Sequence, residues 1–167
     1  MHREFRRAII YLRHTKERLA MEKLDKTDLI ILDILQRNAR TSIKDIAKEA
    51  FLSSPAVSAR IEKLEKFGYV RSFHAEIDNV KLGFYVKAFI DVAIPPEKKA
   101  EFCKFIEKCA NVQECCSVTG EYSMHIKTAF RTTQELDAFV TKLQRYGHTK
   151  TQIVFSTVVE PRGIPLE

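Results

Sequence analysis

The chain has 167 residues, 45% of them hydrophobic and 30% charged, a composition typical of a soluble protein with one large or two small domains. No apolar run approaches the roughly 18 residues that cross a membrane, and charged residues flank the short apolar stretch 8–12. The sequence therefore argues against a membrane span and a signal peptide, and we expect a cytoplasmic protein with no membrane partner.

The net charge of +6 is confined to the N-terminal half of the chain. Residues 1–23 carry +4 and residues 24–75 carry +2, whereas the charges of residues 76–167 cancel. This distribution is expected if the first half contacts a polyanion, although a short basic tail alone would also raise the total.

Residues 1–20 are predicted to be helical and basic, and Met21 stands just before the periodic part of the sequence. One interpretation is a basic arm that contacts DNA. The other is an upstream extension outside the fold, with Met21 as the working start. We favour an extension over residues 1–23, because helical periodicity begins only at Leu24.

Residues 24–38 are predicted to form the first helix of the fold. Asp25 or Thr27 can cap its start, and Asp28 places negative charge in the first turn, where the helix dipole favours it. Its apolar face comprises Leu24, Leu29, Ile31, Leu32 and Leu35.

Two shorter helices joined by a tight turn are predicted within residues 42–67. Thr41 or Ser42 can cap the first, Ser53 or Ser54 can cap the second, and Pro55 fits a first-turn position. The inward positions, spaced by three and four, are Ile43, Ile46, Ala47 and Ala50 in the first helix and Val57, Ile61 and Leu64 in the second. Three short helices with polar joints predict a compact helix-turn-helix bundle.

The outer face of the last of these helices is small and hydroxylic at its start and basic at its end. It comprises Ser54, Ser58, Ala59, Lys63 and Lys66. Small side chains permit close approach to a DNA major groove, hydroxyls bond to phosphates or base edges, and lysines meet the backbone charge. Such helix pairs also occur in bundles that bind no DNA, so this pattern alone leaves both interpretations open.

Gly68 is predicted to end this helix, and residues 69–77 then alternate between apolar and polar side chains. A strand or hairpin here would be the wing of a winged helix-turn-helix domain spanning residues 24–77. Asp78 and Asn79, with Gly83, predict a turn and a linker over residues 78–83.

The second half predicts strands over residues 84–94, 112–119, 123–130 and 149–160, with helices over 97–109 and 132–146. This order is that of a ferredoxin-like βαββαβ domain, residues 84–160, followed by a tail, residues 161–167. The chain as a whole is therefore predicted to be an α+β protein. An apolar open face on such a sheet would be covered by another copy.

The four cysteines, Cys103, Cys109, Cys115 and Cys116, form no CxxC pair and have no histidine cluster at metal-ligand spacing. We expect buried free thiols, and neither a metal site nor a cofactor.

Four stretches in this order resemble the Lrp/AsnC (feast/famine) family of transcriptional regulators, over residues 24–160. They are LDKTDLIILDILQRNAR, FLSSPAVSARIEKLEKFGYV, VTGEYSMHIK and TKTQIVFST. The resemblance implies a homodimer or higher homo-oligomer that binds double-stranded DNA, with an affinity modulated by an amino acid or related metabolite held between C-terminal domains.

The resemblance also implies the site residues. DNA-binding residues would be Ser42, Ser53, Ser54, Pro55, Val57, Ser58, Arg60 and Lys63. Effector-binding residues would be Gly120, Glu121, Tyr122, Ser123, Thr149 and Thr151.

Two residues depart from the family's pattern. Phe51 stands in the turn where the family usually has Gly, and a bulky residue there is strained if the position needs positive φ. Ser123 stands where the family usually has Asp, and it lacks the charge that would bind a ligand's ammonium group. This departure argues against binding of a standard amino acid and favours a different effector, or none.

Three functions are consistent with the sequence. The leading one is an effector-modulated, sequence-specific regulator that is not an enzyme. The second is an architectural DNA-binding oligomer that senses nothing. The third is an enzyme resembling the sirohaem decarboxylases, which keep the same two domains, but His74, His125 and His148 are scattered and favour no catalytic cluster.

Overall fold

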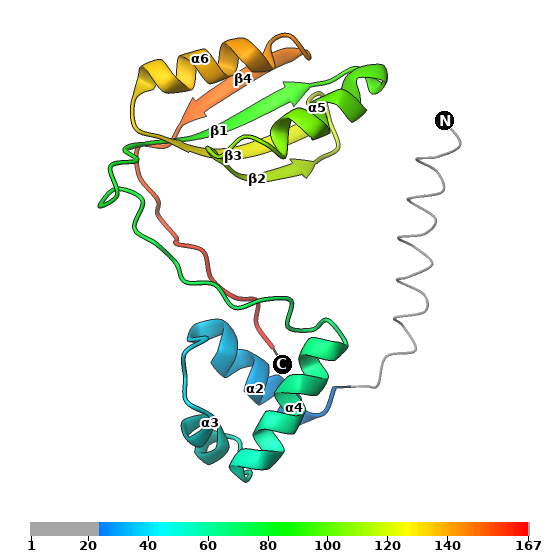
Figure 1. The fold of residues 1–167 in the computed structure, drawn as a ribbon, viewed down its shortest axis with the longest axis vertical. Helices are drawn as coiled ribbons and strands as arrows, with labels where there is room; N and C mark the ends of the chain where they lie inside the picture. The colour runs from blue at the N-terminus through cyan, green and yellow to red at the C-terminus, as the bar shows by residue number, and fades with distance from the viewer. Residues whose placement is uncertain (1–23, 167) are drawn as a thin grey trace. The chain divides into compact units, whose positions relative to one another are not determined.

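The computed structural model describes residues 24–166, which form two compact units (Figure 1). One unit runs from Leu24 to Ala75 and includes the C-terminal tail from Pro161, and the other runs from Glu76 to Glu160. The helix expected over residues 1–20 lies outside the described part. No helix within the described part is long and apolar enough to cross a membrane.

The first helix of the helical unit, α2 (Lys26–Arg37), begins at a capping box. The Asp25 side chain accepts a hydrogen bond from the backbone N–H of Asp28 at 2.8 Å, and the Asp28 side chain accepts one from the N–H of Asp25 at 3.2 Å. Of the two caps that the sequence allowed, Asp25 is therefore the one used.

Helices α3 (Ile43–Glu49) and α4 (Ser54–Lys66) follow, and each starts at a serine. The Ser42 hydroxyl accepts from the N–H of Asp45 at 3.1 Å, and the Ser53 hydroxyl accepts from the N–H of Ala56 at 3.4 Å. These caps satisfy backbone donors that a helix start leaves unpaired, so the local sequence sets both boundaries.

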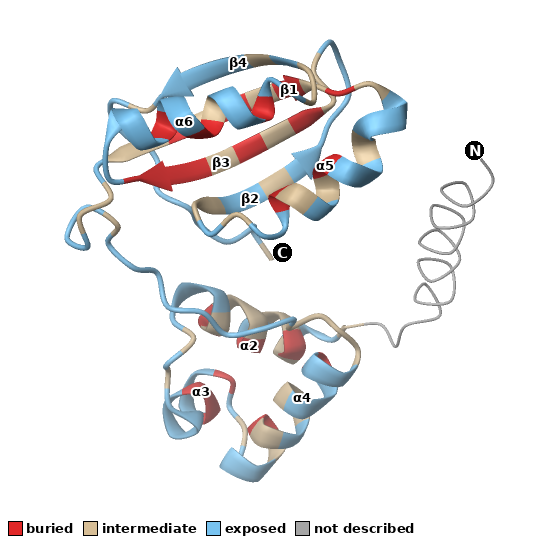
Figure 2. Cartoon of the chain, turned by 45° about the horizontal axis from the view of Figure 1, so that its top comes forward, coloured by how far each residue is buried: buried red, intermediate tan, exposed pale blue. Residues whose placement is uncertain are grey.

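The three helices bury one small apolar core (Figure 2). Its fully buried members are Ile31, Ile34, Ile46, Ala47, Ala50, Val57 and Leu64. The predicted inward face of α2 missed Ile34 and included Leu29, which is only half-buried, and Ile43 of α3 is 36% exposed. The helical period was correct, and the centre of the buried face lies closer to Ile34 than predicted.

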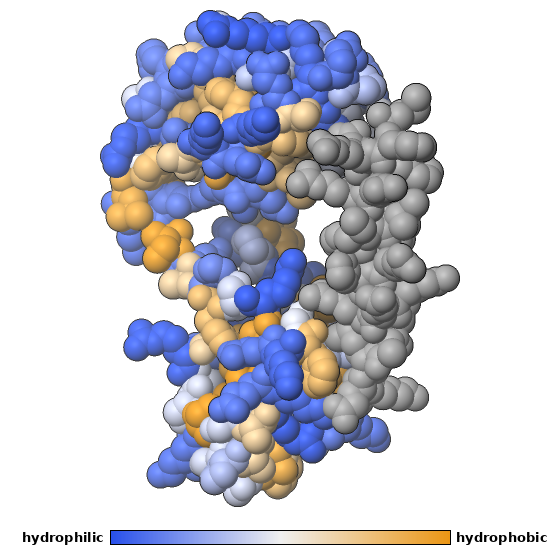
Figure 3. Space-filling model, turned by 45° about the vertical axis from the view of Figure 1, so that its right-hand side comes forward, coloured by the Kyte–Doolittle hydropathy of each residue, from blue (hydrophilic) through white to orange (hydrophobic). Residues whose placement is uncertain are grey.

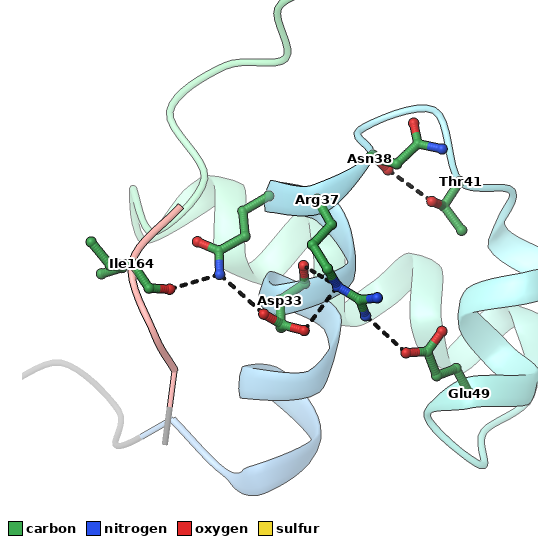
Figure 4. A network of polar contacts seen from close by, with 7 residues as sticks. Asp33, Arg37, Asn38, Thr41, Glu49 and Ile164 are labelled. Carbon is green, nitrogen blue, oxygen red and sulfur yellow. Dashed lines mark hydrogen bonds and ion pairs between the residues drawn. The ribbon is translucent and has the colours of Figure 1, made fainter. Parts of the chain in front are cut away.

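Polar contacts join the end of α2 to its neighbours (Figure 4). The Arg37 guanidinium donates to the Glu49 carboxylate of α3 at 2.9 Å and lies 3.0 Å from the Asp33 carboxylate one turn earlier. The side-chain amide of Gln36 donates to the backbone carbonyl of Ile164 at 2.8 Å, which ties the C-terminal tail to α2.

The strand or hairpin expected over residues 69–77 is not formed, because residues 71–78 are exposed and belong to no sheet. Alternating side chains make a strand only where a second strand accepts the backbone hydrogen bonds. Helix α4 itself ends as predicted, because Gly68 takes a positive φ of 75° and closes the last turn.

The second unit contains a four-stranded antiparallel sheet in the order β2-β3-β1-β4 (Figure 1). The strands are β1 (Val86–Ala93), β2 (Val112–Ser117), β3 (Met124–Phe130) and β4 (His148–Ile153). A 3-10 turn (Pro96–Lys98), α5 (Lys99–Ile106) and α6 (Thr133–Leu143) complete the predicted ferredoxin-like order. The main difference is β4, which ends seven residues before the expected Glu160.

Both helices pack on one face of this sheet, because alternate residues of the two central strands face them. The buried members are Ala88, Ile90, Val92, Ile94, Phe102, Ile106, Met124, Ile126, Phe130, Leu136, Phe139 and Leu143. The thiol of Cys115 faces this core, and burial raises its pKa to about 11, so it stays protonated near neutral pH.

The opposite face of the sheet is more polar than expected. Lys87, Asp91, His125 and Lys127 alternate with the buried residues of β1 and β3, and Phe89 lies among them. The His125 ring stacks on Phe89 with centroids 5.2 Å apart, and its Nδ1 lies 2.6 Å from the Asp91 carboxylate. Covering this face would thus require polar complementarity as well as apolar burial.

Candidate DNA-binding and effector sites

The exposed face of α4 begins with Ser54 and Pro55, continues through the half-buried Ser58 and reaches Lys63. The first turn carries no acidic residue, and Lys63 and Lys66 lie in the last turn. A helix of this kind can approach a phosphate-lined groove without charge repulsion at its start.

Val57 was among the residues expected to face DNA, and its side chain is fully buried. It lies seven residues before Leu64, so both side chains point into the helical core. Val57 therefore supports the position of α4 and is not available for contact with a groove.

Arg60 was expected to contact DNA, but it points back to the start of α2. Its Nη1 donates to Asp25 and to Asp28, both at 2.7 Å, and the side chain is only 31% exposed. These carboxylates raise the pKa of Arg60, with Asp25 the larger influence. The pKa of Asp25 is lowered, first by the backbone N–H of Asp28 and then by Arg60. Arg60 thus joins α4 to the cap of α2.

Ser42 and Ser53 both use their hydroxyls as helix caps, and Ser42 also donates to the Asp45 carboxylate at 2.6 Å. Ser42 lies at the start of α3 and Ser53 directly before α4. Of the two, Ser53 is therefore the one adjacent to the exposed start of α4.

The turn between α3 and α4 has the strained backbone expected of it. Phe51 has a φ of +53°, which bulky side chains rarely adopt. The N–H of Leu52 donates to the carbonyl of Ala47 at 2.9 Å, and the N–H of Phe51 donates to the carbonyl of Lys48 at 3.4 Å. This pair of bonds is a Schellman motif, in which the Phe51 position is normally Gly.

The expected effector loop lies where β3 starts and β1 ends. Gly120 has a φ of +116°, and both Gly120 and Glu121 are exposed. The Tyr122 ring stacks on His148, the first residue of β4, with centroids 6.2 Å apart. Sequence reasoning missed this pair, because Tyr122 and His148 are 26 residues apart and no local pattern links them.

Ser123 faces the protein rather than open space. Its hydroxyl accepts from the N–H of Ile94 at 3.0 Å, and its own N–H donates to the carbonyl of Val92 at 3.1 Å. The side chain that replaces the family's usual Asp therefore fastens β3 to the end of β1.

Thr149 and Thr151 lie opposite Val92 and Ile90 in the β1–β4 register. Thr149 is thus at the same sheet end as Tyr122 and Ser123, whereas Thr151 lies two residues further along and is exposed. The turn before β4 is tight: a Cβ on Gly147 would lie 1.9 Å from the carbonyl oxygen of Ala93.

The three histidines considered for catalysis lie in different surroundings. His74 is exposed in the segment after α4, His125 pairs with Asp91, and His148 stacks on Tyr122. Within residues 24–166, no group of three or more His, Cys, Asp or Glu side chains is placed to hold a metal ion.

Two family models match this chain. A winged helix-turn-helix DNA-binding domain matches residues 24–71, and an Lrp/AsnC ligand-binding domain matches residues 87–164. The transcriptional regulator LrpA of Bacillus subtilis is 30% identical over 132 residues, 78% of this chain and 97% of LrpA. The chain belongs to the Lrp/AsnC family of transcriptional regulators.

Other Lrp/AsnC proteins resemble it in sequence and fold. LrpC of Bacillus subtilis is 27% identical over 141 residues, 84% of this chain and 98% of LrpC. Its solved structure superposes with a TM-score of 0.79. A transcriptional regulator of Neisseria meningitidis, solved as a complex with L-Met, is 25% identical with a TM-score of 0.82, covering 86% of this chain and 97% of that one.

Proposed function

We propose that this Lrp/AsnC protein binds DNA sequence-specifically through α4 and that a small molecule held by its C-terminal domain modulates the affinity. The observation that carries the proposal is the exposed face of α4, hydroxylic at its start and basic at its end, on a helical unit that matches a winged helix-turn-helix domain. The ligand-binding domain in the same chain supplies the sensing part.

In this proposal, Ser53, Ser54, Pro55, Ser58 and Lys63 face the DNA. Ser42 and Arg60 affect DNA binding indirectly, by fixing the positions of α3 and α4, since both bond to carboxylates of the helical unit. Because the partner is DNA, we place the action of the protein in the cytoplasm, and the regulators it resembles favour a function other than catalysis.

For the effector, we propose an amino acid or a related metabolite, by analogy with the Neisseria regulator and its L-Met. Gly120, Glu121, Tyr122 and Thr149 would form this site, with His148 added and Thr151 at its edge. Ser123 offers no charge and bonds to the backbone, so the ammonium group would need Glu121 or a second copy of the chain.

We propose that the working form is a homodimer or larger homo-oligomer. Large apolar side chains are exposed on the segments that flank the sheet, including Phe155 at 100%, Val158 at 94% and Tyr85 at 70%. Figure 3 shows hydrophobic residues, in orange, at the surface of the described part of the chain. A second copy would remove this surface from water.

The deciding experiment selects genomic DNA fragments bound by the purified protein, with and without a mixture of amino acids. We expect specific fragments, an affinity that falls steeply with salt, and a changed set when the effector is present. Lys63→Ala should weaken binding and reduce the salt slope by about one, whereas Lys104→Ala, an exposed lysine of α5, should not. Retention of no fragment at low salt would refute the proposal.

An effector-independent architectural role is the second candidate, and the inward-facing Ser123 hydroxyl favours it. Titration calorimetry with a panel of amino acids separates the two. Binding of DNA together with an absence of heat for every amino acid would favour the architectural role.

A further inference from the structure

Phe51 combines two unfavourable features in one residue. Its backbone has a φ of +53°, and its side chain is 92% exposed to solvent. A left-handed conformation costs free energy for any residue with a Cβ, and an exposed phenyl ring recovers little by burial in its own domain.

The next helix of the same domain ends with the same positive-φ conformation, but there a glycine adopts it. At the end of α4, the N–H of Tyr69 donates to the carbonyl of Leu64 and that of Gly68 to Glu65, both at 2.9 Å. This is again a Schellman motif, and Gly68 takes the left-handed position with a φ of 75°. Phe51 therefore fills a position for which the chain uses glycine elsewhere, which points to a role for its ring outside the fold.

The location of Phe51 indicates which partner the ring meets. It lies two residues before Ser53, the cap of α4, and three and four residues before the exposed Ser54 and Pro55 of the first turn. Helices that enter the major groove contact base edges mainly with their N-terminal residues. Phe51, with its exposed ring, thus precedes the end of the proposed DNA-binding helix that would enter the groove.

The major groove offers an apolar side chain one apolar target, the C5 methyl group of thymine. We propose that Phe51 is a specificity-determining contact, whose ring packs against thymine methyl groups beside the start of α4. The proposal rests on the proposed DNA-binding function and adds a preference for thymine at that position.

The test measures dissociation constants for a duplex selected by the wild-type protein and for the same duplex with deoxyuridine in place of thymidine. Loss of the methyl contact should weaken wild-type binding about three- to fivefold. Phe51→Gly should bind the thymidine duplex about as weakly and should not distinguish the two. Phe51→Tyr keeps the ring on the same backbone and should still distinguish them.

Thermal unfolding accompanies these measurements, since Phe51→Gly relieves the backbone and should be at least as stable as the wild type. Weaker binding by a variant of equal or higher stability supports a direct contact.

Equal sensitivity of the wild type and Phe51→Gly to the missing methyl groups would overturn the proposal. A change of oligomeric mass in Phe51→Gly would also overturn it, because the ring would then belong to an interface between copies. Failure of the wild type to bind any duplex would instead refute the proposed function.

Discussion

Arg60 is the residue whose role changes most once the fold is known. From the sequence it is a cation on a helix expected to bind DNA. In the structure, its guanidinium bonds to two carboxylates at the start of α2, and one of them, Asp28, has a side chain only 9% exposed. This contact therefore contributes to the stability of the helical unit.

Replacing Arg60 with Met should lower the free energy of unfolding of the helical unit by about 1–2 kcal/mol, allowing for solvent screening of a partly exposed pair. The loss arises because the buried Asp28 side chain is left without its guanidinium partner. Urea unfolding followed by circular dichroism measures it.

Arg37→Met is the matched control, since Arg37 pairs with Asp33 and Glu49 at a more exposed position, 59% accessible. It should change the urea midpoint much less than Arg60→Met. Equal effects of the two variants would mean that the Arg60 contact is no stronger than an ordinary surface pair.

At the scale of helices and strands, local signals predicted most of the fold. Asp25, Ser42 and Ser53 cap three helices, and Gly68 ends one, because each interaction spans only a few neighbouring residues. The βαββαβ order followed for the same reason, from apolar periodicity and turn residues.

The failures concern features that depend on a partner distant in sequence. Strand β4 ends at Ile153, which pairs with Ala88, because β1 itself begins only two residues earlier, at Val86. The segment after α4 alternates like a strand but belongs to no sheet. Strand length is set by the adjacent strand, which the local pattern does not contain.

The candidate sites likewise combine features that are predictable locally with features that depend on residues distant in sequence. The exposed start of α4 was predictable from helical spacing, whereas Arg60 bonds to residues 32 and 35 positions away. The Ser123 hydroxyl likewise bonds to Ile94, 29 residues earlier. Contacts of this range depend on tertiary packing, so a motif gives the identity of a residue without the direction of its side chain.

Gly147 lies at a tight junction in the second unit, where the turn after α6 passes the end of β1. Gly147→Ala should destabilise this unit by about 1–3 kcal/mol, because the added Cβ would meet the carbonyl oxygen of Ala93 at 1.9 Å and β4 would have to move. The midpoint of thermal unfolding measures the effect.

Gly120→Ala provides the comparison, since Gly120 has a φ of +116° but no atom within 4 Å of an added Cβ. The loss of stability in Gly120→Ala should come from backbone strain alone, and β4 should stay in place. Amide hydrogen exchange in β4 distinguishes the two: faster exchange is expected in Gly147→Ala only, and unchanged exchange there would contradict the steric argument.

At the scale of the whole molecule, the C-terminal tail is part of the helical unit. The tail was expected to be a separate segment, yet residues from Pro161 onwards group with residues 24–75. The carbonyl of Ile164 accepts from Gln36, and an apolar pocket of about 490 Å³ is lined by tail and helical residues together. Its apolar lining comprises Leu24, Leu32, Leu35, Tyr69, Val70, Ile164 and Leu166. The chain consequently passes between the two units twice.

Ending the chain after Glu160 should therefore destabilise the helical unit, although the deleted residues belong to neither α2, α3 nor α4. Ile164 and Leu166 line an apolar pocket together with Leu32 and Leu35 of α2, so their loss should cost about 1–2 kcal/mol. A chain ended after Leu166 keeps every tail contact described above and is the control. Hydrogen exchange of α2 amides measures the effect separately in the two truncated proteins. Faster exchange in α2 only for the shorter chain supports a structural tail, whereas equal exchange in both would mean that the helical unit is complete without it.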